Sequence, residues 1–156
     1  MSYTGAGSCV VAVNQAGDAN YNAASPVNAT VVVGKANQTI AAFAPTSPVV
    51  FGAAAQTLTA TPGASSSPLA FSLTSGPCAI SGASLSYTGA GSCVVAVNQV
   101  ADANYNAASP VTATVVVGKG NQTSTGFAPT TPVVFGAAAQ TLTATPGAST
   151  SPLVFS

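Results

Sequence analysis

The sequence repeats itself with a period of 84 residues, the offset that separates Ser2 from Ser86. Residues 2–35 match residues 86–119 at 31 of 34 positions, and residues 36–72 match residues 120–156 at 30 of 37. Self-similarity at a fixed period is typical of architectures in which each period folds as one structural unit. We therefore expect a tandem array, of which the chain of 156 residues spans just under two units.

Within one period, short runs alternate apolar and polar residues, as expected of β-strands with one buried face. We count about seven such runs in 84 residues, and Pro and Gly residues separate them as turns. The runs lie at about 37–43, 57–61, 69–74, 78–80, 85–87, 93–97 and 111–117. No segment has a sustained helical period. The pattern predicts an all-β fold, and its size favours an immunoglobulin-like (Ig-like) β-sandwich of about seven strands.

Three motifs resemble those of bacterial Ig-like tandem repeats in very large surface and secreted proteins. They are KANQTI at 35–40, GDANYNAA at 17–24 and GSC at 91–93. The resemblance follows nearly the whole chain in order and places a unit boundary between Lys35 and Ala36. It implies an Ig-like fold, an extracellular or cell-surface location, and neighbouring Ig-like repeats of the same chain as partners.

With that boundary, the chain contains one complete repeat and two incomplete ones. Residues 1–35 are the C-terminal part of a repeat, residues 36–119 a complete repeat, and residues 120–156 the N-terminal part of a third. Each incomplete end leaves apolar strand faces and edges uncovered, and we favour transient association of the two, within or between chains. The alternative is that both ends stay frayed or aggregate. Met1 stands where the repeat has Leu85, which suggests a start at an internal leucine codon of a longer reading frame.

Charge is nearly absent, and this excludes several classes of function. The four charged residues are Asp18, Asp102, Lys35 and Lys119, and there is no His. Proton transfer near neutral pH usually uses His or a tuned carboxylate, so we expect no enzyme, no catalytic residue and no cofactor. We expect the two lysines to be solvated at strand ends. Two positive charges are too few to bind along a phosphate backbone, so we expect no nucleic-acid binding. Apolar runs are far shorter than the roughly 20 residues of a membrane span, so we expect no membrane insertion.

The three cysteines predict one disulfide. Cys9 is the repeat equivalent of Cys93, so a complete unit has two cysteines, Cys78 and Cys93. Both share parity with inward-facing residues such as Ile80 and Val95, and a bridge would close a loop of about 15 residues and stabilise by roughly 3 kcal/mol. We favour the bridge over two buried, reduced thiols, which a reducing compartment would maintain. Cys9 is predicted to be unpaired. We expect no catalytic thiol, because the chain has no His and no cation beside a cysteine, and no zinc site, because it has too few ligands.

The most polar cluster of each unit is the loop at residues 102–106. It could contact a sugar or a calcium ion through Asp102, the amides of Asn104 and Asn106, and a stacking Tyr105. We favour the alternative of a tight inter-strand loop that Asx turns hold, with Tyr105 folded over the end of the sandwich. One carboxylate is too little for a calcium site, which needs about six to eight oxygen ligands, so we expect no metal.

These expectations predict a role as well as a fold. Outward faces of Thr, Ser, Asn and Gln should make stability nearly independent of salt and of pH between about 5 and 8. Units that join with little or no linker should form an extended, semi-stiff rod. We therefore predict a non-catalytic structural stalk or spacer of a secreted or cell-surface adhesin-like protein. The alternatives are an adhesive module whose loops bind a host glycan or protein receptor, and a spacer domain in a secreted hydrolase.

Overall fold

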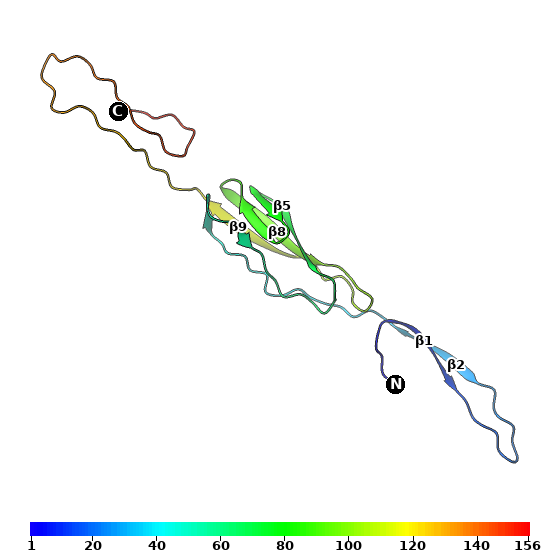
Figure 1. The fold of residues 1–156 in the computed structure, drawn as a ribbon. Coiled ribbons are helices and arrows are strands. Elements are labelled where there is room, and N and C mark those ends of the chain that lie inside the picture. Colours follow the sequence, from blue (N-terminus) through cyan, green and yellow to red (C-terminus); the bar gives the residue numbers. More distant parts are fainter. The chain divides into compact units, whose positions relative to one another are not determined.

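The computed structural model describes residues 1–156 and contains β-strands but no helix (Figure 1). The chain divides into two compact units, Met1–Gly118 and Lys119–Ser156. All nine strands lie in the first unit. The prediction of an all-β chain is confirmed. None of the structure is a helix with the length and apolar character needed to cross a membrane.

The first unit begins with a hairpin of two strands, β1 (Gly7–Val13) and β2 (Val27–Val33). The strands pair antiparallel, with Gly7 opposite Val33 and Val13 opposite Val27. A hairpin of two strands has two faces, and here no second sheet packs against either face. As a result most of the valines of this hairpin are exposed, although Val31 and Val33 are half-buried.

Seven strands follow in two further sheets. They are β3 (Val49–Val50), β4 (Gln56–Thr57), β5 (Leu69–Ser75), β6 (Cys78–Ser81), β7 (Ser84–Tyr87), β8 (Gly91–Gln99) and β9 (Val111–Gly118). One sheet has the strand order β3-β9-β8-β5, and the other has the order β4-β7-β6. β3 runs parallel to β9, whereas the remaining neighbours are antiparallel. Two sheets of four and three strands are the arrangement expected of a β-sandwich.

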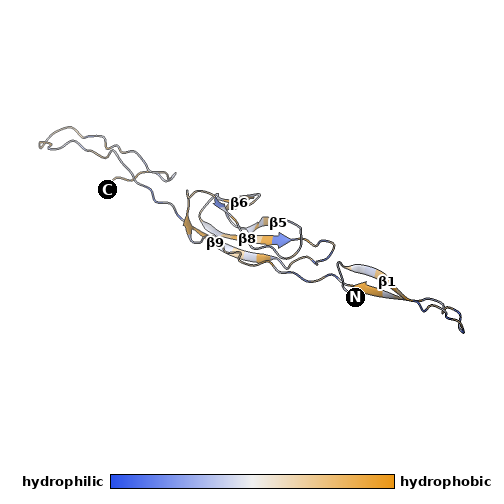
Figure 2. Ribbon diagram, turned by 60° about the horizontal axis from the view of Figure 1, so that its bottom comes forward, coloured by the Kyte–Doolittle hydropathy of each residue, from blue (hydrophilic) through white to orange (hydrophobic).

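The hydrophobic core lies between these two sheets. Leu58, Cys78 and Leu85, from the three-stranded side, pack in one cluster with residues of β8 and β9. The buried members from β8 and β9 are Cys93, Val95, Val115 and Val117. Figure 2 shows orange, apolar stretches along β8 and β9, and the predicted alternation of buried and exposed residues is confirmed on β5, β6, β7 and β9.

The prediction of a first strand at residues 37–43 is wrong. This segment forms only isolated bridges, and inside it Ala41 pairs with Thr61. Ala42 has φ 53°, in the left-handed region, and a strand cannot continue through that conformation. Ile40 is nevertheless buried, so the alternating pattern reflects contact with the core without a ladder of backbone hydrogen bonds. The first strand of the four-stranded sheet is instead the two-residue β3.

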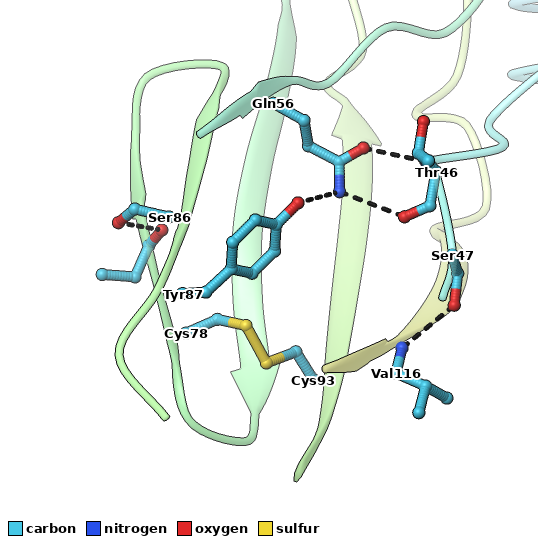
Figure 3. Close-up of a disulfide and its surroundings, with 9 residues drawn as sticks. Thr46, Ser47, Gln56, Cys78, Ser86, Tyr87, Cys93 and Val116 are labelled. Atoms are coloured by element: carbon cyan, nitrogen blue, oxygen red, sulfur yellow. Dashed lines mark hydrogen bonds between the residues drawn. A yellow bond between two sulfur atoms is a disulfide. The ribbon is translucent and has the colours of Figure 1, made fainter. Parts of the chain in front are cut away.

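A disulfide joins Cys78 on β6 to Cys93 on β8 and so connects the two sheets, as predicted (Figure 3). The two Cα atoms are 6.1 Å apart. Both cysteines are buried, in agreement with the parity of the strands. The turn before β6 needs a glycine, because Gly76 has φ +103° and a Cβ there would lie 2.6 Å from the Cα of Cys93.

Next to the disulfide, side chains tie the segment before β3 to both sheets (Figure 3). Gln56 Oε1 accepts a hydrogen bond from the backbone N–H of Thr46 at 2.8 Å, and Gln56 Nε2 donates to Tyr87 Oη at 2.7 Å. The hydroxyl of Ser47 accepts a hydrogen bond from the N–H of Val116 at 3.0 Å. The first of these bonds satisfies a backbone group of the segment before β3, and the last satisfies the N–H of Val116 on β9.

The second unit, Lys119–Ser156, contains no strand, but it repeats local contacts of residues 36–72. Thr125 pairs with Thr145, as Ala41 does with Thr61. The ring centroids of Phe127 and Phe155 are 5.7 Å apart, against 5.9 Å for the equivalent pair in the first unit. At the position of Ala42 this unit has Gly126, with φ 70°. The left-handed residue is therefore a feature of this segment in both places.

Candidate functional site

The loop at residues 102–106 lies between β8 and β9, and its own sequence determines its shape. Asp102 Oδ1 accepts hydrogen bonds from the N–H groups of Asn104 at 2.8 Å and Tyr105 at 2.9 Å. The repeat-equivalent Asp18 accepts from its own loop at 2.8 and 2.9 Å, although that loop is exposed. Because the same geometry forms without surrounding structure, it is a local Asx-type turn.

The second carboxylate oxygen of Asp102 is also occupied by the protein. Asp102 Oδ2 accepts hydrogen bonds from the N–H of Ser66 at 2.9 Å and from its hydroxyl at 3.2 Å. The N–H of Ser66, followed by that of Asn104, lowers the pKa of Asp102 from 3.8 to about 2. The carboxylate is therefore ionised at neutral pH, and protein donors fill both of its oxygens. The structure contains no group of three or more His, Cys, Asp or Glu residues that could hold a metal ion.

A buried glutamine supports the strand that leads into this loop. Gln99, at the end of β8, has 2 % of its surface exposed. Its Oε1 accepts the N–H of Gly63 at 2.7 Å, and its Nε2 donates to the carbonyls of Ser65 at 3.1 Å and Ser67 at 2.8 Å. These bonds satisfy the buried side chain of Gln99 itself and backbone groups of Ser65, which is buried, and of Gly63 and Ser67, which are half-buried.

A second glutamine connects the loop to the start of the complete repeat. Gln38 Oε1 accepts the N–H of Ser65 at 2.7 Å, and Gln38 Nε2 donates to the carbonyl of Asn106 at 2.8 Å. Sequence analysis missed both glutamines. Gln99 has the parity of the inward-facing Val95 and Val97, and an uncharged amide at a core position was the signal that could have revealed it.

The loop also holds the chain at the boundary between the first two segments. The backbone of Ala36 pairs with the loop on both sides, since its N–H donates to the carbonyl of Asn104 at 2.9 Å and its carbonyl accepts from Asn106 at 2.8 Å. Asn106 Nδ2 also donates to Asn37 Oδ1 at 2.8 Å. Ala36 and Asn37 are thus attached to the β8–β9 loop.

Two further contacts reach the preceding segment, residues 1–35. Asn104 Oδ1 accepts the backbone N–H of Ala6 at 2.9 Å. Lys35 Nζ donates to the carbonyl of Asp102 at 2.6 Å. The expectation that Lys35 is simply solvated at a strand end is therefore incomplete. The side chain is exposed, but its ammonium group donates to a backbone carbonyl.

A shallow cleft of about 250 Å³ lies beside these contacts. It is lined by Tyr3, Thr4, Gly5, Ala6, Val33, Gly34, Ala36, Asn104 and Tyr105. Of the four candidate ligand residues, Asn104 and Tyr105 line this cleft, whereas the polar groups of Asp102 and Asn106 bond to the protein itself. Cys9, expected to be unpaired, is a free, half-buried thiol on β1.

Comparison of the chain with protein-family models, curated proteins and solved structures finds no match.

Proposed function

We propose that the complete repeat, residues 36–119, is a non-catalytic stalk or spacer module of a secreted or cell-surface adhesin-like protein. The observation that carries the proposal is the direct attachment of one segment to the next. β2 ends at Val33, and Ala36 is already paired with the loop of the following repeat. Only Gly34 and Lys35 lie between them, and Lys35 is itself hydrogen-bonded to that loop.

So short a boundary restricts the motion of one repeat relative to the next. A flexible linker would need several free residues, whereas here the backbone on both sides of the boundary is hydrogen-bonded. Repeats that contact only their neighbours form a quasi-linear array whose stiffness depends on these contacts. An array of such repeats would hold a terminal domain away from the surface that carries it.

The strand arrangement supports an Ig-like assignment for the repeat. Seven strands lie in sheets of four and three, and the first of them, β3, runs parallel to the last, β9. A disulfide links the two sheets, as in antibody domains, but here it joins the fourth and sixth of the seven strands, β6 and β8. A disulfide also favours an oxidising location, which supports the proposed extracellular site.

The proposal is tested with arrays of one, two and four copies of residues 36–119, measured by small-angle X-ray scattering. We expect the maximum dimension to increase by a constant amount for each added copy. In a control array, a Gly/Ser linker is inserted between Lys119 of one copy and Ala36 of the next. This control should scatter as a flexible chain. Arrays that resemble this control without any inserted linker would refute the stalk.

A second function has an observation in its favour. The cleft at the boundary is lined by Tyr3, Asn104 and Tyr105, and the side-chain oxygen of Asn104 is already bonded to the N–H of Ala6. Aromatic rings with a neighbouring amide are a common means of holding a sugar ring. An adhesive module would show saturable binding on a glycan array, and Tyr105→Ala would abolish it. The spacer of a secreted hydrolase has the same mechanics as the stalk and differs in the domain that it carries.

A further inference from the structure

The inner face of the β1–β2 hairpin is only partly covered. Val11, Val13 and Val27 are exposed on it, whereas Cys9, Val31 and Val33 are half-buried. Val97, on β8, is fully buried, whereas its equivalent on β1, Val13, is 66 % exposed. The pairing of the two hairpins is the same, since Gly7 lies opposite Val33 as Gly91 lies opposite Val117. The hairpin therefore has the same strand pairing as β8 and β9. The two copies differ in whether other residues pack against the inner face.

The complete repeat shows which residues provide that cover. Phe43, Leu58 and Phe71 pack against the buried valines of β8 and β9. All three belong to residues 36–72, which recur at 30 of 37 positions as residues 120–156.

In the copy, the equivalent residues are Phe127, Leu142 and Phe155, and all three are exposed. Leu142 is 39 % exposed, against 2 % for Leu58. The two phenylalanines already contact each other, with ring centroids 5.7 Å apart. Residues 120–156 thus present an apolar surface that matches the inner face of the hairpin.

Polar groups on the two surfaces are also complementary. Gln15 is the equivalent of the buried Gln99 and is exposed in the hairpin. The backbone groups that Gln99 binds have their equivalents in Gly147, Ser149 and Ser151. The N–H of Ser149 is already bonded to Gln122 Oε1 at 2.6 Å, as that of Ser65 is to Gln38. Part of the polar network is therefore formed before any association.

We propose that the β1–β2 hairpin of one copy of this chain binds residues 120–156 of a second copy, and that the two surfaces form one sandwich core. Each chain has one surface of each kind, so the contact is heterologous and can continue from chain to chain. The joined core lacks an equivalent of residues 73–85, which include β6 and Cys78, and Ser124 replaces the buried Ile40. Because its core is smaller than that of the complete repeat, the association is reversible. The proposal applies to the 156-residue chain, in which both surfaces are exposed, and not to repeats inside an array, which cover these surfaces themselves.

Sedimentation velocity of the 156-residue chain over a hundredfold range of concentration tests this contact. We expect the weight-average sedimentation coefficient to rise with concentration. Val13→Asp, which places a charge on the inner face of the hairpin, and Phe155→Asp, which places one on the matching surface, should each abolish the rise. Val32→Asp is the control, because Val32 lies on the opposite, outward face of β2 and should leave the rise unchanged.

Mixing the two defective variants gives a sharper result. The Val13→Asp chain keeps an intact 120–156 surface, and the Phe155→Asp chain keeps an intact hairpin. A mixture should therefore form dimers that do not grow further, although each variant alone is monomeric. Circular dichroism melting of each variant should show the unchanged transition of the complete repeat. A monomeric wild type, a mixture that stays monomeric, or equal loss of association in Val32→Asp would overturn the proposal.

Discussion

The side-chain oxygen of Asn104 accepts a hydrogen bond from the backbone N–H of Ala6 at 2.9 Å, across 98 residues of sequence. This bond links the loop of the complete repeat to the preceding segment. Asn104→Ala should remove it and make the β1–β2 hairpin more mobile, while the unfolding free energy of the repeat changes by less than about 1 kcal/mol. ¹⁵N relaxation of hairpin amides would detect the change. Asn20→Ala is the matched control, and equal relaxation in both variants would contradict the role of this bond.

Loss of the disulfide should destabilise the complete repeat without changing its fold. Cys78→Ser combined with Cys93→Ser opens a loop of 15 residues, for which the chain-entropy model gives about 3 kcal/mol. Denaturation in urea would measure the loss, and reduction of the wild type should reproduce it. Cys9→Ser should have little effect, because the Cys9 thiol is free. A double variant as stable as the wild type would show that the bridge contributes nothing to folding.

Gln99→Leu should be among the most destabilising single changes that conserve approximate volume. It leaves the buried carbonyl of Ser65 and the half-buried N–H of Gly63 and carbonyl of Ser67 without their partner, and a buried, unsatisfied group costs about 1–3 kcal/mol. The same substitution at Gln15, its exposed equivalent, should cost little in dilute solution. Urea midpoints of the two variants give the comparison, and similar values would mean that the glutamine network is not a source of stability.

Asp102 should make stability dependent on pH only in acid. Its pKa in the folded chain, about 2, lies below the ordinary value of 3.8, so the folded state favours the ionised form. The contribution is complete above the unfolded pKa and is lost as pH falls from about 4 towards 2. Asp102→Asn should therefore be less stable than wild type near neutral pH, and the difference should shrink in that acid range. Urea midpoints between pH 2 and about 6 would show it, with Asp18→Asn as the control. A constant difference would refute the assignment.

Alternation of residues predicted the strands of the core because burial itself follows the pleat. Leu69, Phe71 and Leu73 face inward on β5, and the shared parity of Cys78 and Cys93 correctly predicted the disulfide. These features need only the period of a strand, which a sequence displays directly.

The parts that sequence did not reveal depend on backbone atoms. Residues 37–43 alternate as a strand does, but the left-handed Ala42 interrupts them. Ala42 itself gives no sign of that conformation, and the signal in the sequence is the glycine at its repeat equivalent, Gly126. The contacts of Lys35 and Asn104 go to a backbone carbonyl and a backbone N–H, which every residue has. No spacing or residue type distinguishes such partners in advance, so the attachment of the loop to the boundary became visible only in three dimensions.

The parallel pairing of β3 with β9 has a mechanical consequence. In the stalk that we propose, a force on the two ends would draw β3 towards its N-terminus and β9 towards its C-terminus. Their hydrogen bonds would then be loaded together in shear and would not break one after another. Should the repeat give way, the covalent bond between Cys78 and Cys93 keeps the residues between them from lengthening. An array of such repeats would resist a rapidly applied pulling force, and on unfolding it would extend by only part of its full contour length.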